Sequence, residues 1–178
     1  MAKPPRAEPS GPDEGAGAGE GHPAIVLETW LPYRLFGVAT RIAEILQSYY
    51  APRYGLTLAA WRAMAVVGAR PGASAGEIAQ AAGLDQFAAS RAIGLLVELG
   101  LAGRESARRD RRFAAIALTS EGRRVFLDIS RLALRLEAEL VAGLDAAERA
   151  ALEGALAKVE DASAVLRAKG LRGVMPEG

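Results

Sequence analysis

The chain has 178 residues, 51% of them hydrophobic, and a formal net charge of +1 at pH 7. It contains no cysteine and one histidine, His22, which excludes disulfides, thiol nucleophiles and thiolate or histidine metal clusters. No apolar run approaches the roughly 18 residues that a membrane span needs, and no apolar stretch of signal-peptide type precedes Ala24. We therefore expect a soluble, cytoplasmic protein with no membrane partner.

The two ends of the chain are predicted to lack structure. Residues 1–22 hold four prolines and five glycines but no valine, isoleucine, leucine or aromatic residue, which favours a disordered tail. Acidic residues outnumber basic ones in this tail, which argues against a DNA-binding arm, although contact with a partner stays open. Residues 171–178 are expected to be a flexible C-terminus, which leaves one domain over residues 23–170.

Apolar residues recur at helical spacing from Ile25 onward. Pro32 suits the first turn of a helix that runs to about Tyr50, where "APRYGLT" interrupts the pattern. Thr57 is placed to cap a second helix, "LAAWRAMAVVG", which ends at Gly68.

A helix-turn-helix is predicted next. Ser74 and Glu77, in "SAGE", form a capping box that opens a short helix closed by Gly83. Asp85 caps the following helix, which runs to about residue 99 and stops at Gly100. Two short helices joined by a tight turn are typical of this motif.

A basic β-hairpin follows the helix pair. "LAGRES" and "RFAAIALT" are predicted strands, and Ala114, Ile116 and Leu118 share one face of the second. Residues 104–112 hold five arginines and two acidic residues, a net charge of +3 in a chain of +1. Because such a concentration suits phosphates, we interpret the hairpin as the wing of a winged-helix lobe spanning about residues 56–119.

Two long helices complete the chain. Thr119 and Ser120 are placed to cap a helix over about 121–143, and Asp145 and Glu148 form a second capping box that opens a helix to about Lys169. Apolar stripes follow both, at Val125, Ile129, Leu132, Leu136 and Leu140 and at Leu152, Leu156, Val159, Ala162 and Leu166. This surface predicts a homodimer through helices at about 25–50 and 120–169, the alternative being packing within one chain.

The predicted fold is therefore mainly α with a small β-hairpin wing. It combines a winged helix-turn-helix lobe with long N- and C-terminal dimerisation helices. In element order, roughly residues 28–168 resemble the MarR family of bacterial transcription regulators. The motifs that carry the resemblance are Asp110-x-Arg112, "LT-x-x-G" at Leu118, Thr119 and Gly122, and Leu56, Thr57 and Trp61.

This resemblance implies a homodimer that binds a roughly palindromic operator in double-stranded DNA, usually to repress nearby genes. It also implies release by a small aromatic or acidic effector bound between the DNA lobe and the dimer helices. A phenolic acid or its coenzyme A thioester is the effector class that the resemblance suggests.

The second helix of the pair is the candidate recognition helix. Ala89, Ala92, Ile93 and Leu96 fit a buried face, which leaves Gln86, Phe87, Ser90, Arg91 and Gly94 outward. Glutamine suits an adenine edge, arginine a guanine edge, and serine either bases or phosphates. Phe87 stands where the family has a small polar residue, and two roles stay open for it: packing on thymine methyls or turning into the core. Gly94 and Leu95 also replace a more polar pair.

The wing supplies further candidates. Arg112 matches the family's minor-groove arginine, and Asp110 is positioned to orient a neighbouring arginine. Arg104 is also a predicted DNA contact, and Arg108, Arg109 and Arg111 suit phosphate contacts. Ser74, at a helix N-terminus, is either a phosphate contact or only a cap.

An effector pocket is predicted from Trp30, Arg34 and Arg41 on the first helix and Trp61 and Met64 on the second. In this interpretation Arg34 holds a carboxylate of the effector, and the aromatic rings sandwich its apolar body. The alternative is that the aromatic residues belong to the core and that Arg34 forms an ion pair.

Two other functions compete with a DNA-binding regulator. A winged-helix protein-interaction module would leave the wing arginines without a role. An enzyme would need a nucleophile–base pair or a phosphate-binding glycine loop, and the sequence offers neither, nor a cofactor motif.

Overall fold

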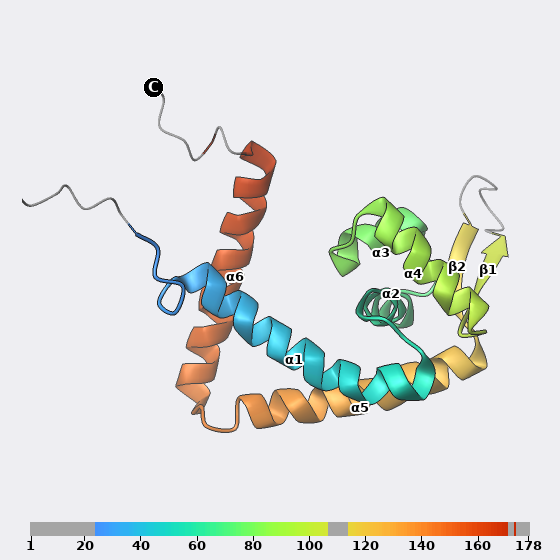
Figure 1. Ribbon diagram of the computed structural model, residues 1–178, viewed down its shortest axis with the longest axis horizontal. Coiled ribbons are helices and arrows are strands. Elements are labelled where there is room, and N and C mark those ends of the chain that lie inside the picture. Colours follow the sequence, from blue (N-terminus) through green and yellow to red (C-terminus); the bar gives the residue numbers. More distant parts are fainter. Residues whose placement is uncertain (1–23, 107–113, 171–172, 174–178) are drawn as a thin grey trace, which may run out of the picture. The chain divides into compact units, whose positions relative to one another are not determined.

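The computed structural model describes residues 24–106, 114–170 and 173. The chain divides into two compact units, Met1–Ala39 and Thr40–Gly178, and each is described by itself. The elements run in the order α1 (Leu31–Tyr54), α2 (Leu58–Ala69), α3 (Ala75–Ala82), α4 (Gln86–Glu98), β1 (Ala102–Ser106), β2 (Ala114–Leu118), α5 (Ser120–Leu140) and α6 (Ala146–Lys169) (Figure 1). This order confirms the predicted class, mainly helical with one small β-hairpin.

Helix α1 is longer than predicted. The interruption expected after Tyr50 does not occur, because the helix continues through Pro52 to Tyr54 and ends at Gly55, whose φ is +67°. A proline this close to a helix end removes one backbone hydrogen bond only, and the N–H of Gly55 still donates to the carbonyl of Ala51 at 2.9 Å. The fully buried Tyr50 anchors this last part of α1 to the core.

The predicted helix N-caps are present, except that Ser120 is the first residue of α5 and Thr119 alone caps that helix. Thr57, Ser74, Asp85, Thr119 and Asp145 each accept a hydrogen bond from a backbone N–H in the first turn of the helix that follows. Both predicted capping boxes form, and Gly83 closes α3 with a φ of +64°. Helix ends were predicted less well, since α2 ends at Ala69 instead of Gly68, and α5 ends at Leu140 instead of Gly143.

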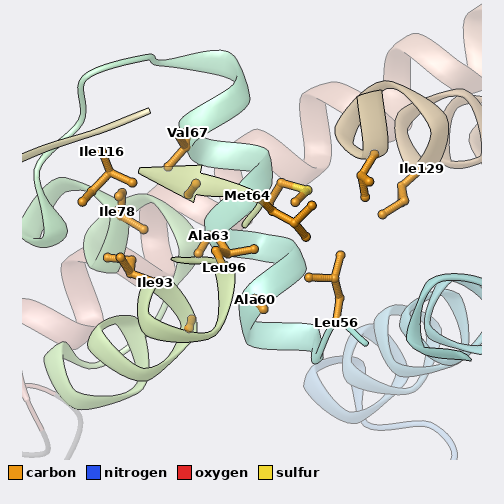
Figure 2. Packing of buried hydrophobic residues seen from close by; sticks show 14 of the residues in the cluster. Leu56, Ala60, Ala63, Met64, Val67, Ile78, Ile93, Leu96, Ile116 and Ile129 are labelled. Carbon is orange, nitrogen blue, oxygen red and sulfur yellow. The ribbon is translucent and has the colours of Figure 1, made fainter. Parts of the chain in front are cut away.

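The core surrounds α2, which packs against α3, α4, β2 and α5 (Figure 2). Its largest fully buried side chains include Leu56, Met64, Ile78, Ile93, Leu96 and Ile129. Each such side chain contributes about 1.5–3 kcal/mol through burial, so the lobe that carries α4 is stabilised within one chain. Helices α2 and α5 also approach each other closely at Gly68, since a Cβ there would lie 2.8 Å from the Phe126 ring.

The wing is attached to the lobe on both sides. Strands β1 and β2 are antiparallel, with Ala102 opposite Leu118. The other edge of β2 pairs with the turn before α3: the N–H of Ile116 donates to the carbonyl of Ala73 at 3.1 Å, and that of Gly72 to Ile116 at 3.0 Å. This second pairing was not predicted, and it fixes the buried Ile116 against the core.

The "LT-x-x-G" motif joins three elements at the base of the wing. The hydroxyl of Thr119 donates to the carbonyl of Gly100 at 2.7 Å, and its backbone N–H donates to the carbonyl of Leu101 at 3.1 Å. The same hydroxyl accepts from the N–H of Gly122 at 3.0 Å. A Cβ at Gly122 would lie 1.8 Å from the Leu101 carbonyl oxygen, so only glycine fits there. The motif is therefore structural.

Two tyrosines join the end of α1 to α5. The hydroxyls of Tyr49 and Tyr54 both donate to one carboxylate oxygen of Asp128, at 2.7 Å and 2.6 Å. These hydrogen bonds hold the pKa of Asp128 below its usual value, and the bond from Tyr54 has a larger effect than the bond from Tyr49. The bond to Asp128 in turn raises the pKa of both tyrosines.

Burial falls steadily along the two C-terminal helices. Val125 and Ile129 of α5 are buried, Leu132 and Leu136 are half-buried, and Leu140 is 57% exposed. Every residue of α6 is exposed, including the whole of its predicted apolar stripe. The predicted apolar surface is therefore covered at the start of α5 and uncovered at the end of α5 and along α6.

Candidate nucleic-acid interface

Helix α4 has two chemically different faces. Its inner face, with Ala89, Ala92, Ile93 and Leu96, is buried against α2 and α3, as predicted. Its outer face consists of Gln86, Phe87, Ser90, Arg91 and Gly94, and all five are exposed. The structure thus brings the four predicted contact residues of this helix together on one accessible surface.

The turn before α4 fixes the direction in which the helix leaves the lobe. Gly83 adopts a left-handed conformation, and the N–H of Leu84 donates back to the carbonyl of Ala79 at 2.9 Å. The carboxylate of Asp85 then accepts from the N–H of Ala88 at 2.7 Å and starts α4. Because this cap uses the oxygen of Asp85, the first outward side chains are those of Gln86 and Phe87.

Phe87 lies on the surface and not in the core. Its side chain is 68% exposed, and the guanidinium carbon of Arg91 lies 4.4 Å from the centre of its ring. Of the two roles left open by the sequence, the structure therefore excludes the inward one. Arg91 is held over an aromatic face, a geometry that favours a cation.

Ser74 is engaged by its own helix. Its hydroxyl donates to the carboxylate of Glu77 at 2.7 Å, and its backbone N–H donates to the same oxygen at 2.8 Å. The bond from the Ser74 N–H is the main reason that the pKa of Glu77 lies below its usual value. A phosphate contact through Ser74 has to compete with this box and with the negative charge of Glu77.

The basic wing is described only in part. Arg104 lies on β1, is exposed and pairs across the hairpin with Ile116. The other predicted contacts of the wing, Arg108, Arg109, Asp110, Arg111 and Arg112, lie outside the described residues.

The predicted effector residues occupy different environments. Trp30 and Arg34 belong to the N-terminal unit, and both are exposed. Arg41 belongs to the other unit and is exposed on α1.

Trp61 and Met64 both belong to the core region. Trp61 is half-buried between the rings of Tyr50 and Phe126, with ring centres 6.0 Å and 6.3 Å away. Met64 is fully buried in the lobe core. An effector can contact Met64 only if the core opens.

The sequence analysis did not predict two polar features formed by tyrosines of α1. One is the Tyr49–Tyr54–Asp128 cluster, which combines residues 74 and 79 positions apart. The other is the hydroxyl of Tyr50, which is buried and has no hydrogen-bond partner among the described residues. Burial raises the pKa of this hydroxyl. Tyrosines at helical spacing gave no signal that distinguished these roles from ordinary packing.

The described residues contain neither a metal-binding cluster nor a membrane-spanning helix. No group of three or more histidine, aspartate or glutamate side chains is placed to hold a metal ion there. None of the helices in residues 24–106 and 114–170 combines the length and apolar character needed to cross a membrane.

A two-helix unit with an exposed polar second helix, followed at once by a β-hairpin, defines a winged helix-turn-helix protein. The sequence profile of the MarR family matches residues 54–112, which cover α2, α3, α4 and β1. No curated protein sequence gives a significant match.

Solved structures extend the likeness to most of the chain. The transcriptional repressor CouR, crystallised on a 23-mer DNA duplex, is 30% identical over 75% of this chain and 94% of its own, with a TM-score of 0.64. A MarR-family regulator from Silicibacter pomeroyi is 28% identical over 75% of this chain and 90% of its own, with a TM-score of 0.66. PcaV from Streptomyces coelicolor, crystallised with its natural ligand, shares the fold at 22% identity and a TM-score of 0.66, over 80% of this chain and 99% of its own.

The chain belongs to the MarR family of winged-helix, DNA-binding transcriptional regulators. This confirms the resemblance that the wing and "LT-x-x-G" motifs indicated.

Proposed function

We propose that this protein is a homodimeric repressor that binds a palindromic operator and is released by a small aromatic or acidic effector. The observation that carries the proposal is the outer face of α4, where Gln86, Ser90 and Arg91 lie exposed on a lobe whose core is complete within one chain. CouR, 30% identical, is a repressor crystallised on DNA, which supports the same activity here.

In the proposed complex, α4 lies in the major groove. Arg91 then donates to a guanine edge, Gln86 to an adenine edge, and Ser90 to a base or phosphate. Arg104 lies on the wing strand, where it suits a backbone phosphate, which fixes position without selecting sequence. The wing arginines, Arg112 foremost, enter the proposal on the sequence alone, as minor-groove and phosphate contacts.

The homodimer is proposed from uncovered apolar surface in the Thr40–Gly178 unit. Ile42 and Ile45 of α1 and Leu136 and Leu140 of α5 line an open groove of about 250 Å³ with Glu139. The α6 stripe, including Leu152 and Leu156, is exposed along the whole helix. A second copy covers such surface with identical residues, and places two recognition helices about 10 base pairs apart, one turn of DNA.

The effector class is proposed from the family and from one unusual group. PcaV was crystallised with its natural ligand, so the fold holds small molecules in at least that relative. In this chain the Tyr50 hydroxyl has no hydrogen-bond partner among the described residues, and the Tyr50 ring lies next to that of Trp61. Because Tyr50 is fully buried, its hydroxyl can bond a polar group of a ligand only when the core opens, as at Met64. A phenolic acid or its coenzyme A thioester is the class we propose, with Arg41, Trp61 and Met64 as candidate contacts in the Thr40–Gly178 unit.

DNA binding is tested with the intact protein and the DNA upstream of its own gene. We expect fluorescence anisotropy to show specific binding that weakens steeply with salt, because several arginines displace counterions. Arg91→Ala should weaken binding about ten- to hundred-fold, the value of one bidentate base contact. The matched control is Glu98→Ala, at the far end of the same helix.

Equal binding by Arg91→Ala and the wild-type protein would refute the α4 assignment. Arg112→Ala should also bind much more weakly while the dimer stays folded. Absence of any operator binding at low salt, from a folded dimer, would favour the protein-interaction module instead.

The effector is tested by adding aromatic acids and their coenzyme A thioesters to the protein–DNA complex. Tyr50→Phe removes only the hydroxyl, and since that hydroxyl is buried with no partner in the part of the chain that the structure describes, the variant should be at least as stable as the wild type. We expect it to bind operator normally and to respond less to the effector. A full response by Tyr50→Phe would remove Tyr50 from the proposed site.

A further inference from the structure

Phe87 is the least expected residue on the outer face of α4. Its ring is 68% exposed, so it contributes little to the stability of the lobe. Isolated exposed hydrophobic residues are common on protein surfaces, but this one lies on the face proposed to meet DNA. It also has a defined neighbour, because Arg91 lies one helical turn further along with its guanidinium 4.4 Å from the ring centre.

The residues next to Phe87 and Arg91 on this face have small side chains or none. Residues 87, 90, 91 and 94 follow the i, i+3, i+4, i+7 spacing that places them along one side of a helix. Ser90 and Gly94 are small, and a Cβ at Gly94 would meet no atom of the described residues within 4 Å. The ring of Phe87 and the guanidinium of Arg91 therefore project together from a surface that leaves room on both sides of them.

The major groove offers each of these two groups one favoured partner. A guanidinium donates two hydrogen bonds to O6 and N7 of guanine, and the apolar group at the groove surface is the C5 methyl of thymine. Neighbouring base pairs are about 3.4 Å apart along the helix, close to the separation of ring and guanidinium. The pair is therefore spaced to contact two adjacent base pairs.

We infer that Phe87 and Arg91 recognise DNA as a unit, with Phe87 on a thymine methyl and Arg91 on the guanine of the adjacent base pair, once in each operator half-site. This inference rests on the proposed function, in which α4 enters the major groove. Stacking on the ring also holds Arg91 before DNA arrives, so fewer side-chain conformations are lost when it binds.

The thymine methyl can be removed without altering base pairing. Each thymine of one operator half-site is replaced in turn by deoxyuridine, and the dissociation constant is measured by fluorescence anisotropy. For the wild-type protein we expect one substitution, next to a guanine, to weaken binding about four-fold, the value of one buried methyl group.

Phe87→Ala should bind less tightly than wild type and be insensitive to that same substitution. The matched control is Val97→Ala, which removes another exposed apolar side chain of α4, 40% exposed, in the last turn of the helix. It should keep the four-fold sensitivity. Circular dichroism and thermal unfolding check that α4 stays folded in each variant.

The outcomes separate this inference from the function on which it rests. If Arg91→Ala weakens binding but no deoxyuridine position distinguishes wild type from Phe87→Ala, the paired recognition is wrong and the α4 assignment stands. If Arg91→Ala and Phe87→Ala both bind like wild type, the α4 assignment fails and the inference fails with it. A methyl-dependent loss that disappears only in Phe87→Ala supports the inference.

Discussion

The winged-helix lobe and helix α6 are built on opposite principles. The lobe buries Leu56, Met64, Ile78 and Leu96 completely within one chain. Helix α6 is capped as well as any helix of the lobe, yet none of its residues is buried. N-caps and apolar residues at helical spacing thus produce a helix both in the lobe and at α6. Whether its apolar face is buried depends on which other element packs against that face. The lobe is expected to fold on internal contacts, and α6 to gain its packing from a second copy.

The sharpest test of the lobe is Gly122→Ala. Its new Cβ would lie 1.8 Å from the Leu101 carbonyl oxygen, a backbone atom that cannot yield without moving the base of the wing. We expect a loss of about 3 kcal/mol or more in the free energy of unfolding, at the upper end for overpacked sites. Urea unfolding followed by circular dichroism measures it, and wild-type stability in this variant would contradict the assignment.

The sequence could predict much of the lobe because its signals are local. Thr57, Ser74 and Asp85 each cap a helix through a backbone N–H only three residues further along the chain. The side chains around Ile116 alternate between the two faces of a strand, which predicts that strand. The outward face of α4 followed from the same periodicity. The contact of Gly122 with Leu101 could not be predicted, because it depends on how distant segments approach each other.

The same limit applies outside the lobe. The carboxylate of Asp128 is shared by tyrosines more than 70 positions away, and no spacing rule connects them. The extension of α1 past Pro52 also depends on tertiary packing, through the buried Tyr50, and propensity alone predicted the opposite.

The counterpart on α6 is Leu156→Asp. Leu156 is 43% exposed, so the change should leave a protomer intact, but in a two-fold dimer it removes an apolar contact twice and adds two charges. We expect the dimer dissociation constant to rise about a hundred-fold, from roughly 1.5 kcal/mol per lost leucine contact. Sedimentation velocity measures it.

Lys158→Asp, two residues along and on another side of α6, is the control for Leu156→Asp. Lys158→Asp also introduces an aspartate, but away from the apolar stripe, so this variant should dimerise like wild type. If both variants stay dimeric, α6 does not supply the interface. If both dissociate, charge and not the apolar stripe determines assembly.

Asp128 is intermediate between the buried core of the lobe and the exposed helix α6. Its partly buried hydrogen bonds join α1 to α5. Its pKa is lowered by the bonds from Tyr54 and Tyr49, so its stabilising effect is complete above the usual carboxyl pKa and is lost as pH falls through the lowered value. The pKa values of Tyr49 and Tyr54 are raised from 10.0, so their effect is complete below pH 10 and is lost as pH rises through the raised values.

Asp128→Asn should therefore destabilise the protein most between about pH 4 and pH 10, with the difference from wild type shrinking at either side. Unfolding curves across this range measure the difference. Asp161→Asn, on the exposed α6, is the matched change and should alter stability little at any pH. A pH-independent effect of Asp128→Asn would show that packing, not ionisation, connects α1 to α5.

The smallest change in stability is expected for a substitution of Gly94, in the lobe. Gly94 lies inside α4, where glycine costs about 0.5–1 kcal/mol relative to alanine, and open space surrounds its Cβ position. Gly94→Ala should therefore stabilise the lobe by about that amount in urea unfolding, opposite in sign to Gly122→Ala. Since no atom of the described residues requires glycine at this position, weaker operator binding by a more stable Gly94→Ala would indicate that the DNA needs the space that glycine leaves. Unchanged binding would leave the groove wide enough there for a methyl group.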